Sequence, residues 1–247
     1  MKVIISPAKK LTNENIKISN PSTIQFVEET KYLVDQLRDY TLADLKKLMG
    51  LSDGLARLNF DRYQQWDLTS EQVNPAIYIF QGDVYKGLRA EEFSASELAF
   101  AQDNLRILSG LYGILKPLDL VFPYRLEMGT NMHTKFGNTL YEFWGDKLNR
   151  ALSSEMEPQE VLVNLASNEY SKVLQLESMS QQIITPVFKD YKNGKLKVIS
   201  FFAKKARGEM ANFIINNAIT NSEDLKLFSN DGYVFSECNE GEILFTR

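Results

Sequence analysis

Short apolar runs alternate along this chain with segments whose apolar residues repeat at helical spacing. The run Val3-Ile4-Ile5, which is stopped by Ser6-Pro7, and the run at 161–165 are predicted to be buried strands. Residues 22–39 and 203–217 instead place apolar side chains on one helical face. Because strands and helices interleave, we predict an α/β (mixed α+β) fold, with a mixed β-sheet flanked by helices. The chain has no internal repeat and no linker, so residues 1–247 are expected to form a single compact domain.

Turn signals predict two hairpins in the second half. Asn193-Gly194 separates the strand-like segments 182–191 and 195–202, and both turn residues tolerate a positive φ. A closing hairpin is predicted from 232–236 and 242–246.

The first half carries a strand signal and a cap signal. Residues 76–80 are predicted to form a strand. Ser94-Ala95-Ser96-Glu97 has the pattern of a capping box, and the helix that it begins is predicted to continue through Leu105 and Leu108.

The charge balance excludes a protein coated in positive charge. Among 247 residues, Lys and Arg total 28 and Asp and Glu total 32, which gives a net charge of −4. Any site for a polyanion must therefore come from local clustering of cations. There is one histidine, His133, and one cysteine, Cys238, so a disulfide within the chain and a multi-histidine or multi-cysteine metal site are excluded. We expect both residues to be incidental, and we expect no metal and no cofactor.

No segment resembles a targeting or membrane sequence. The apolar run at residues 3–5 is too short for a signal peptide, and no stretch approaches the ~20 apolar residues that cross a bilayer. We expect a cytoplasmic protein with no membrane contact and no obligate protein partner.

The most basic segment is Ala203-Lys204-Lys205-Ala206-Arg207-Gly208. A strand is predicted to end here and a helix to begin, which would put three cations in a first helical turn, against the macrodipole. Such a turn is stabilised by a bound anion, so the segment predicts a phosphate site, with Lys204 and Arg207 facing the same side. The alternative is a solvated basic turn.

A glycine turn at 109–117 is the second candidate. Gly110 and Gly113 allow a tight turn with exposed amides, and Arg106, Lys116 and Arg125 are close in sequence. The alternative is an ordinary helix end.

Residues 45–58 read as two short helices around Gly50, with Ser52 as a possible cap for the second. This pattern resembles a helix-hairpin-helix, a module that grips a duplex backbone through turn amides and nearby cations, here Lys46, Lys47 and Arg57. The alternative is a helix pair that only packs.

Polar residues end two of the predicted buried strands. Ser6 is a conceivable nucleophile with Lys9 or Lys10 as its base. Asn164, Ser167 and Glu169 end the strand at 161–165 and are candidates to line the same cleft. The alternatives are an ordinary turn at Ser6 and a helix cap at Ser167.

Together these motifs resemble the signature runs of the YaaA family, the bacterial peroxide-stress-resistance family. The likeness spans residues 3 to about 245 and leaves out only the loop 130–138. It is carried by Ser6-Pro7-Ala8-Lys9, Gly82-Asp83-Val84-Tyr85, Leu108–Gly113 with Lys116–Asp119, Pro123–Gly129, Asn164–Ser167 with Glu169-Tyr170, and Ala203–Gly208.

The resemblance implies a cytoplasmic protein that helps cells to survive hydrogen peroxide, limits free iron and binds DNA. It also implies one compact α/β domain with a positively charged cleft and a helix-hairpin-helix element. It implies no catalytic residue.

We therefore predict a peroxide-stress protein that binds double-stranded DNA without strong sequence specificity and helps to limit iron-driven damage. The predicted nucleic-acid-binding residues are Lys9, Lys10, Lys46, Lys47, Arg57, Lys86, Arg106, Lys116, Arg125, Lys204, Lys205 and Arg207. The alternative is an enzyme that acts on a phosphorylated or nucleobase-containing substrate in the same cleft, with Ser6, Lys9, Asn164, Ser167 and Glu169 as catalytic candidates. Direct iron sequestration is disfavoured, because the sequence has no Glu-x-x-His pattern.

Overall fold

A computed structural model describes residues 1–12 and 14–247. Its main element is an eight-stranded mixed sheet. In spatial order the strands are β11 (Val234–Asn239), β12 (Glu242–Thr246), β9 (Gln182–Lys192), β8 (Val161–Asn164), β1 (Lys2–Ile5), β5 (Leu105–Ser109) and β6 (Gly113–Leu115), and β10 (Lys195–Lys197) pairs with β9. The five strands from β12 to β5 are parallel, whereas β11 and β6 close the two edges in antiparallel pairs. The predicted α/β class is confirmed.

The chain order reverses at β1. From β1 the chain goes to β5 on one side, and it later returns to the other side of β1 as β8. Val3 of β1 is in register with Leu105 and with Val163, so β1 is the buried centre of the sheet. Such a reversal leaves a crevice at the carboxyl ends of the two strands, where α/β proteins commonly bind ligands.

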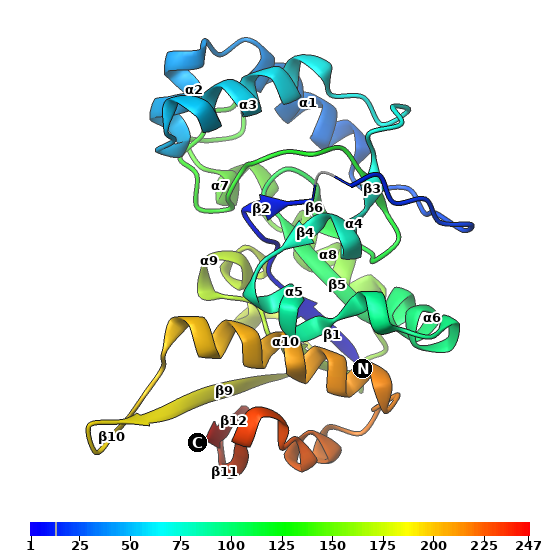
Figure 1. Cartoon of the computed structure of the whole chain (residues 1–247), viewed down its shortest axis with the longest axis vertical. Coiled ribbons are helices and arrows are strands. Elements are labelled where there is room, and N and C mark those ends of the chain that lie inside the picture. The colour runs from blue at the N-terminus through cyan, green and yellow to red at the C-terminus, as the bar shows by residue number, and fades with distance from the viewer. Residues whose placement is uncertain (13) are drawn as a thin grey trace.

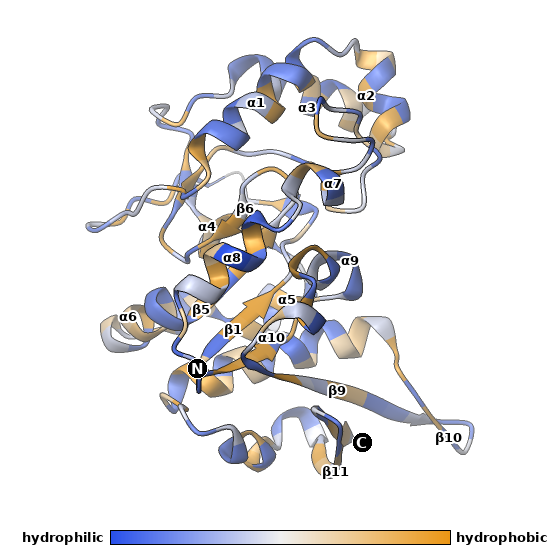
Figure 2. Ribbon diagram, turned by 180° about the vertical axis from the view of Figure 1, so that it is seen from behind, coloured by the Kyte–Doolittle hydropathy of each residue, from blue (hydrophilic) through white to orange (hydrophobic). Residues whose placement is uncertain are grey.

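Helices cover both faces of the sheet. The two views place α10 in front of the strands and α8 behind them, with α1, α2 and α3 gathered at one end of the molecule (Figures 1 and 2). The apolar colour of β1 and β5 marks the core between these layers (Figure 2).

The helix bounds are α1 (Val27–Arg38), α2 (Leu42–Met49), α3 (Asp53–Gln65), α4 (Ala76–Ile79), α5 (Asp83–Leu88), α6 (Ala95–Asn104), α7 (Leu140–Trp144), α8 (Lys147–Ser154), α9 (Asn168–Ser171) and α10 (Ser200–Asn216). Short 3-10 helices span Ala90–Glu92, Lys172–Leu174, Leu176–Ser178, Ser222–Leu227 and Asn230–Gly232. Two small antiparallel pairs join β2 (Lys10–Leu11) to β4 (Phe80–Gln81) and β3 (Asn74–Pro75) to β7 (Leu120–Val121).

The local turn and cap signals are confirmed. Asn193 and Gly194 have φ values of 54° and 73° and connect β9 to β10, although β10 is shorter than predicted. The Ser94 hydroxyl accepts a hydrogen bond from the Glu97 amide, and the Glu97 carboxylate accepts one from the Ser94 amide. The C-terminal strands β11 and β12 form the predicted closing hairpin.

Two predictions of element type are wrong. Residues 76–79 form a helical turn, and only Phe80 and Gln81 of that segment are extended. The helix that begins after Ser94 ends at Asn104, and Leu105 and Leu108 belong to β5 instead. Both segments are buried except for the half-buried Tyr78, so their apolar residues carry no periodicity that would distinguish a strand from a helix.

The helix α10 begins earlier than predicted, and this changes the phosphate argument. It starts at Ser200, so Lys204, Lys205 and Arg207 lie in its second turn and not in its first. The predicted support from free first-turn amides is therefore wrong. What remains is the spacing of three residues between Lys204 and Arg207, which keeps both on one face of the helix.

None of the helices formed by residues 1–12 and 14–247 is long and apolar enough to cross a membrane.

Candidate functional site

A pocket of about 670 Å³ lies where the chain order reverses, and we call it the switch-point pocket. One wall is the loop Ser6–Lys10, which follows β1, and a second is Leu165–Tyr170, which follows β8. Gln81–Tyr85, which begins α5, and the α10 residues Lys204 and Arg207 complete the lining. The polar ends of two parallel strands therefore meet in one site, as the sequence predicted for Ser6 and Ser167.

Close packing of α5 against α10 holds two of these walls together. A Cβ built at Gly208 would lie 1.8 Å from the Val84 carbonyl oxygen, and one at Gly87 would lie 2.2 Å from the Lys205 carbonyl oxygen. Only glycine permits this approach of two helix backbones. The contact places Val84 and Tyr85 of α5 beside Lys204 and Arg207 in the pocket lining.

Hydrogen bonds join the two strand-end loops. The Ser6 hydroxyl oxygen accepts the Ser167 amide at 2.9 Å and lies 3.3 Å from the Ser167 hydroxyl. The Tyr85 hydroxyl donates to the Ser6 carbonyl at 3.2 Å. The buried Asn164 side chain accepts the Ala166 amide at 3.1 Å and so shapes the loop after β8 from beneath the pocket. Ser167 precedes α9 as predicted, but its side chain makes no cap hydrogen bond.

The two cations on α10 are the uncompensated charges of this site. Arg207 is half-buried, and within the described chain it has no ion-pair or hydrogen-bond partner. Burial lowers the pKa of Arg207 from its ordinary value, because the charged guanidinium loses water. Lys204 is exposed at the pocket and is likewise unpaired among the residues that the structure describes. An anion is the ligand that such a pair of cations would bind.

The other charged groups of the pocket are largely engaged. Lys9 forms an ion pair of 3.1 Å with Glu127, and Asp83 lies 3.6 Å from Lys86. A Glu169 carboxylate oxygen accepts the Gly129 amide at 3.2 Å. Lys10 is exposed at the rim. Glu169 has no cationic partner among the described residues, so its negative charge offsets one positive charge, and the unpaired Lys10, Lys204 and Arg207 leave the lining with a net positive charge.

Two buried tyrosines add an aromatic component. Tyr85 and Tyr170 line the pocket, and burial raises the pKa of each hydroxyl well above its ordinary value. Both rings therefore stay neutral across the physiological range. Pro7, Val84 and Leu165 extend this apolar part of the lining.

The structure leaves several predicted cations outside the switch-point pocket. Arg106 is buried and forms an ion pair with Glu155, and Lys205 pairs with Glu209 and Asp231 at 3.0 and 3.1 Å. Arg125 pairs with Glu127 at 3.0 Å beside the pocket. Lys116 lines a separate hollow with Asp119 and Glu155, and Lys86 lines a neighbouring one behind Gly82.

The glycine turn at 109–113 is part of the core and offers no amides to a ligand. It is the buried turn between β5 and β6, and the Leu111 and Tyr112 amides both donate to the Ser109 hydroxyl. The predicted anion-binding turn is therefore wrong at this position.

The helix pair α2 and α3 is connected through Gly50-Leu51-Ser52, with Gly50 in the left-handed region at φ 60°. Ser52 precedes α3, but its side chain makes no cap hydrogen bond. Lys46 pairs with Asp53 at 2.6 Å, whereas Lys47 and Arg57 are exposed. The contact of this pair with DNA stays a prediction.

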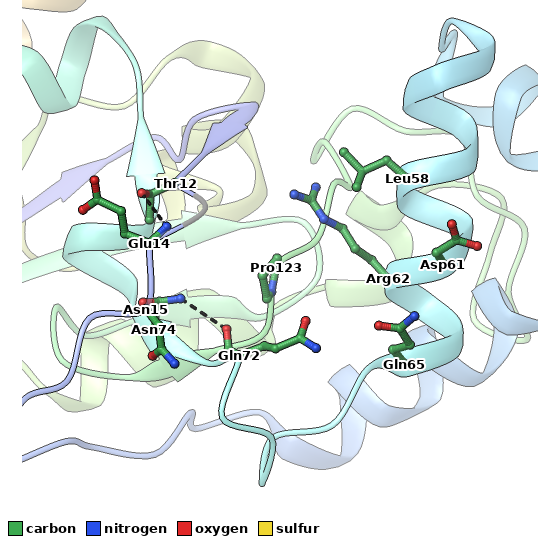
Figure 3. Close-up of a pocket in the computed structure, with 10 residues that line it drawn as sticks. All are labelled: Thr12, Glu14, Asn15, Leu58, Asp61, Arg62, Gln65, Gln72, Asn74 and Pro123. Atoms are coloured by element: carbon green, nitrogen blue, oxygen red, sulfur yellow. Dashed lines mark hydrogen bonds between the residues drawn. The ribbon is translucent and has the colours of Figure 1, made fainter.

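A second pocket, which we call the α3 pocket, has about 410 Å³ and lies between α3 and the segment that follows β2 (Figure 3). Arg62 reaches from α3 across it towards Pro123, and amide side chains line its lower part (Figure 3). Glu14 and Asp61 add two carboxylates to the same lining, although neither forms an ion pair with Arg62 within the described chain. Its lining therefore lacks the excess of positive charge that marks the switch-point pocket.

The two incidental residues lie away from both linings. His133 is exposed, and its Nδ1 is 2.7 Å from the Asn138 side-chain oxygen. Cys238 is exposed on β11. Sequence reasoning missed Gln81 as a lining residue, whereas Asn168 and Tyr170 belong to the run 164–170 that was expected to line the cleft, without a role of their own.

Comparison with known proteins identifies the family of this chain. A UPF0246 protein of Aliivibrio fischeri strain MJ11 is 51% identical over 242 residues, which is 96% of this chain and 93% of the relative. A UPF0246 protein of Saccharophagus degradans is 48% identical over 254 aligned residues, covering 100% of this chain and 99% of the relative. A family model described as peroxide stress protein YaaA matches residues 1–239. The chain therefore belongs to the YaaA family of peroxide stress proteins.

Proposed function

We propose that this peroxide stress protein acts in the cytoplasm by binding double-stranded DNA without strong sequence specificity. The observation that carries the proposal is the pair Lys204 and Arg207, which line one pocket and have no acidic partner within the described chain. Phosphate is the group that such cations bind in nucleic acids, and contacts with phosphate carry no sequence information. Lys9 and Lys10, on the facing loop, extend the positive rim.

The helix pair α2–α3 supplies a second, weaker contact in this proposal. Lys47 and Arg57 are exposed on it, so their charges are open to a phosphate, whereas the Gly50 and Leu51 amides of the turn both donate to the Lys46 carbonyl. We include Lys46 with them because its partner Asp53 is also exposed, so a phosphate can compete for this ion pair.

The test is to measure the binding of duplex DNA by fluorescence anisotropy at several salt concentrations. The wild-type protein should lose affinity linearly in log salt, and the variant Lys204→Glu/Arg207→Glu should bind every duplex more weakly, with a slope shallower by about 2. Lys31→Glu/Arg150→Glu changes the net charge equally on exposed residues outside the site and should bind as the wild type does. Salt-independent binding, or a folded pocket variant with wild-type affinity, overturns the proposal.

Protection of DNA from iron-driven damage is the second part of the proposal. Bound protein should reduce nicking of a supercoiled plasmid by ferrous iron and peroxide, and the Lys204→Glu/Arg207→Glu variant should not. Equal protection by both would show that protection does not require DNA binding at this site.

An enzyme acting on a phosphorylated or nucleobase-containing substrate is the second candidate. Its support is the presence of Ser6, Ser167 and Glu169 in the lining of the same pocket. Lys9 pairs with Glu127 and makes no hydrogen bond to Ser6 within the described chain, so a serine activated by Lys9 is not assembled. Turnover of a nucleotide or DNA substrate that is lost in Ser6→Ala or Glu169→Gln, with binding retained, would establish this function. No turnover across such a panel would remove it.

A further inference from the structure

The volume of the switch-point pocket exceeds what contacts with a DNA backbone require. Lysines on an open surface suffice to neutralise phosphates, and nonspecific binding needs no cavity. A duplex is too wide to enter a hollow of about 670 Å³. That volume lies in the range of pockets that hold a single small ligand. A ligand that occupies the interior of the pocket must therefore be smaller than a duplex.

The lining has two chemically different parts. Lys204 and Arg207 supply unpaired positive charge from α10. Pro7, Val84 and Leu165, with the neutral rings of Tyr85 and Tyr170, supply apolar surface from the other walls. An occupant that satisfies both parts carries an anion at one end and a flat, largely apolar body at the other.

Polar groups between these parts limit the choice further. Gln81 and Asn168 line the pocket, and neither side chain makes a hydrogen bond to another described residue. An amide side chain offers one acceptor and two donors, which matches the mixed donor and acceptor edge of a nucleobase. Both side chains are exposed and can bind water, and a nucleobase edge can replace that water, whereas the apolar body of a fatty acid or a simple aromatic acid offers these amides no hydrogen bond.

We propose that the switch-point pocket binds one nucleotide as a unit, with its phosphate on Lys204 and Arg207 and its base on the apolar wall beside Gln81 and Asn168. The inference rests on the proposed function, because it takes the nucleic acid as the source of that nucleotide. An unpaired nucleotide that leaves the stack can enter the pocket while the flanking backbone stays on the rim.

Free ligands test the pocket without DNA. Binding of deoxyadenosine 5′-monophosphate, deoxyadenosine and inorganic phosphate is measured by calorimetry on the wild-type protein. The nucleotide should bind at least about tenfold more tightly than either fragment, because only it contacts both parts of the lining. Phosphate that binds as tightly as the nucleotide would overturn the base contact, and no binding of any of the three would overturn the inference.

Two matched substitutions locate the site. Asn168→Trp places a bulky ring in the lining at an exposed position and should abolish nucleotide binding. Asn239→Trp makes the same change on the exposed strand β11 and should leave binding intact. Equal affinities of the two variants would place the nucleotide elsewhere and overturn the inference.

A duplex with a single 2-aminopurine then tests the source of the nucleotide. Its fluorescence should rise several-fold on protein binding if the base leaves the stack, and Asn168→Trp should prevent the rise. If duplex binding is salt-dependent, but the free nucleotide does not bind and the 2-aminopurine fluorescence does not rise, the inference fails and the proposed function stands. If the nucleotide binds but duplex does not, the proposed function fails, and the nucleotide comes from the free pool.

Discussion

The two pockets of this protein differ in the charge that their linings leave uncompensated. In the switch-point pocket, Lys204 and Arg207 have no acidic partner within the described chain. In the α3 pocket, Arg62 shares the lining with Glu14 and Asp61 and reaches the Asn59 side chain only at 3.4 Å (Figure 3). A hollow in the surface is therefore not sufficient for a polyanion site. The balance of charges around it decides which ligand it attracts.

Their positions in the fold differ as well. The switch-point pocket is built on the ends of β1 and β8, whose backbones are fixed by pairing in the centre of the sheet. The α3 pocket is built between one helix and two connecting segments. Groups placed by a sheet hold their geometry better than groups placed by connecting segments.

The largest expected difference is in how glycine-to-alanine substitutions change the free energy of unfolding at α10, beside the switch-point pocket, and at α3. Gly208→Ala should destabilise the protein by about 3 kcal/mol, because the new Cβ would collide with the Val84 backbone and push α5 away from α10. Gly54→Ala in α3 meets open space and should stabilise the protein by up to about 1 kcal/mol. Urea denaturation of both variants measures the two changes.

A Gly208→Ala variant as stable as the wild type would contradict the close helix contact. It would also remove the reason for placing α5 beside Lys204 and Arg207.

A smaller difference is expected from removing one arginine from each pocket. Arg207→Ala should weaken duplex binding about tenfold, or ~1.4 kcal/mol, because it removes an unpaired cation from the switch-point pocket. Arg62→Ala should change the affinity by less than about twofold, because the α3 lining sets two carboxylates, Glu14 and Asp61, against one arginine and so has no excess of positive charge to attract DNA. Anisotropy titrations at one fixed salt concentration compare the two. A larger loss of affinity in Arg62→Ala than in Arg207→Ala would indicate that the nucleic acid binds at the α3 pocket.

The smallest expected effect concerns Asp231, the partner of Lys205, which lies on α10 but does not line the switch-point pocket. Hydrogen bonds from Lys205, and then from Arg247, lower the pKa of Asp231, against the opposing effect of its partial burial. A carboxyl whose pKa is lower in the folded state stabilises the protein above its unfolded value of about 3.9, and this contribution is lost as the pH falls through the folded pKa. Asp231→Asn should therefore reduce stability slightly at neutral pH.

The measurement is the urea midpoint of Asp231→Asn and of the wild type from pH 7 down to pH 2. The gap between the two should close below about pH 4. A gap that is constant with pH would show that the charge of Asp231 does not contribute.

The sequence predicted the elements whose signals are local. The Ser94–Glu97 capping box and the Asn193-Gly194 turn depend on hydrogen bonds and φ values within a few residues, and both are present. The strand β1 and its polar end at Ser6 were also predicted, because an apolar run stopped by Ser-Pro leaves few alternatives. These signals were sufficient for the fold class and for half of the pocket.

The wrong predictions of element type at 76–79 and 105–109 share one cause. Both segments are buried except for the half-buried Tyr78, so nothing in their apolar pattern separates a helix from a strand. The sheet decides the second case, because Ile107 pairs with Ile5 of β1 on one side and with Leu115 of β6 on the other. Such pairing is a property of the fold and not of the segment.

The sequence by itself determined that the chain is an α/β protein of a peroxide-stress family, with cations placed near the ends of its strands. Only the tertiary structure decided which of those cations remain available to a ligand. Arg106 meets Glu155 across 49 residues and Lys205 meets Asp231 across 26, whereas Arg207 meets no acidic side chain in the described chain. Ion pairs between distant residues form only when the fold brings them together, so sequence proximity could not foretell which charges are neutralised.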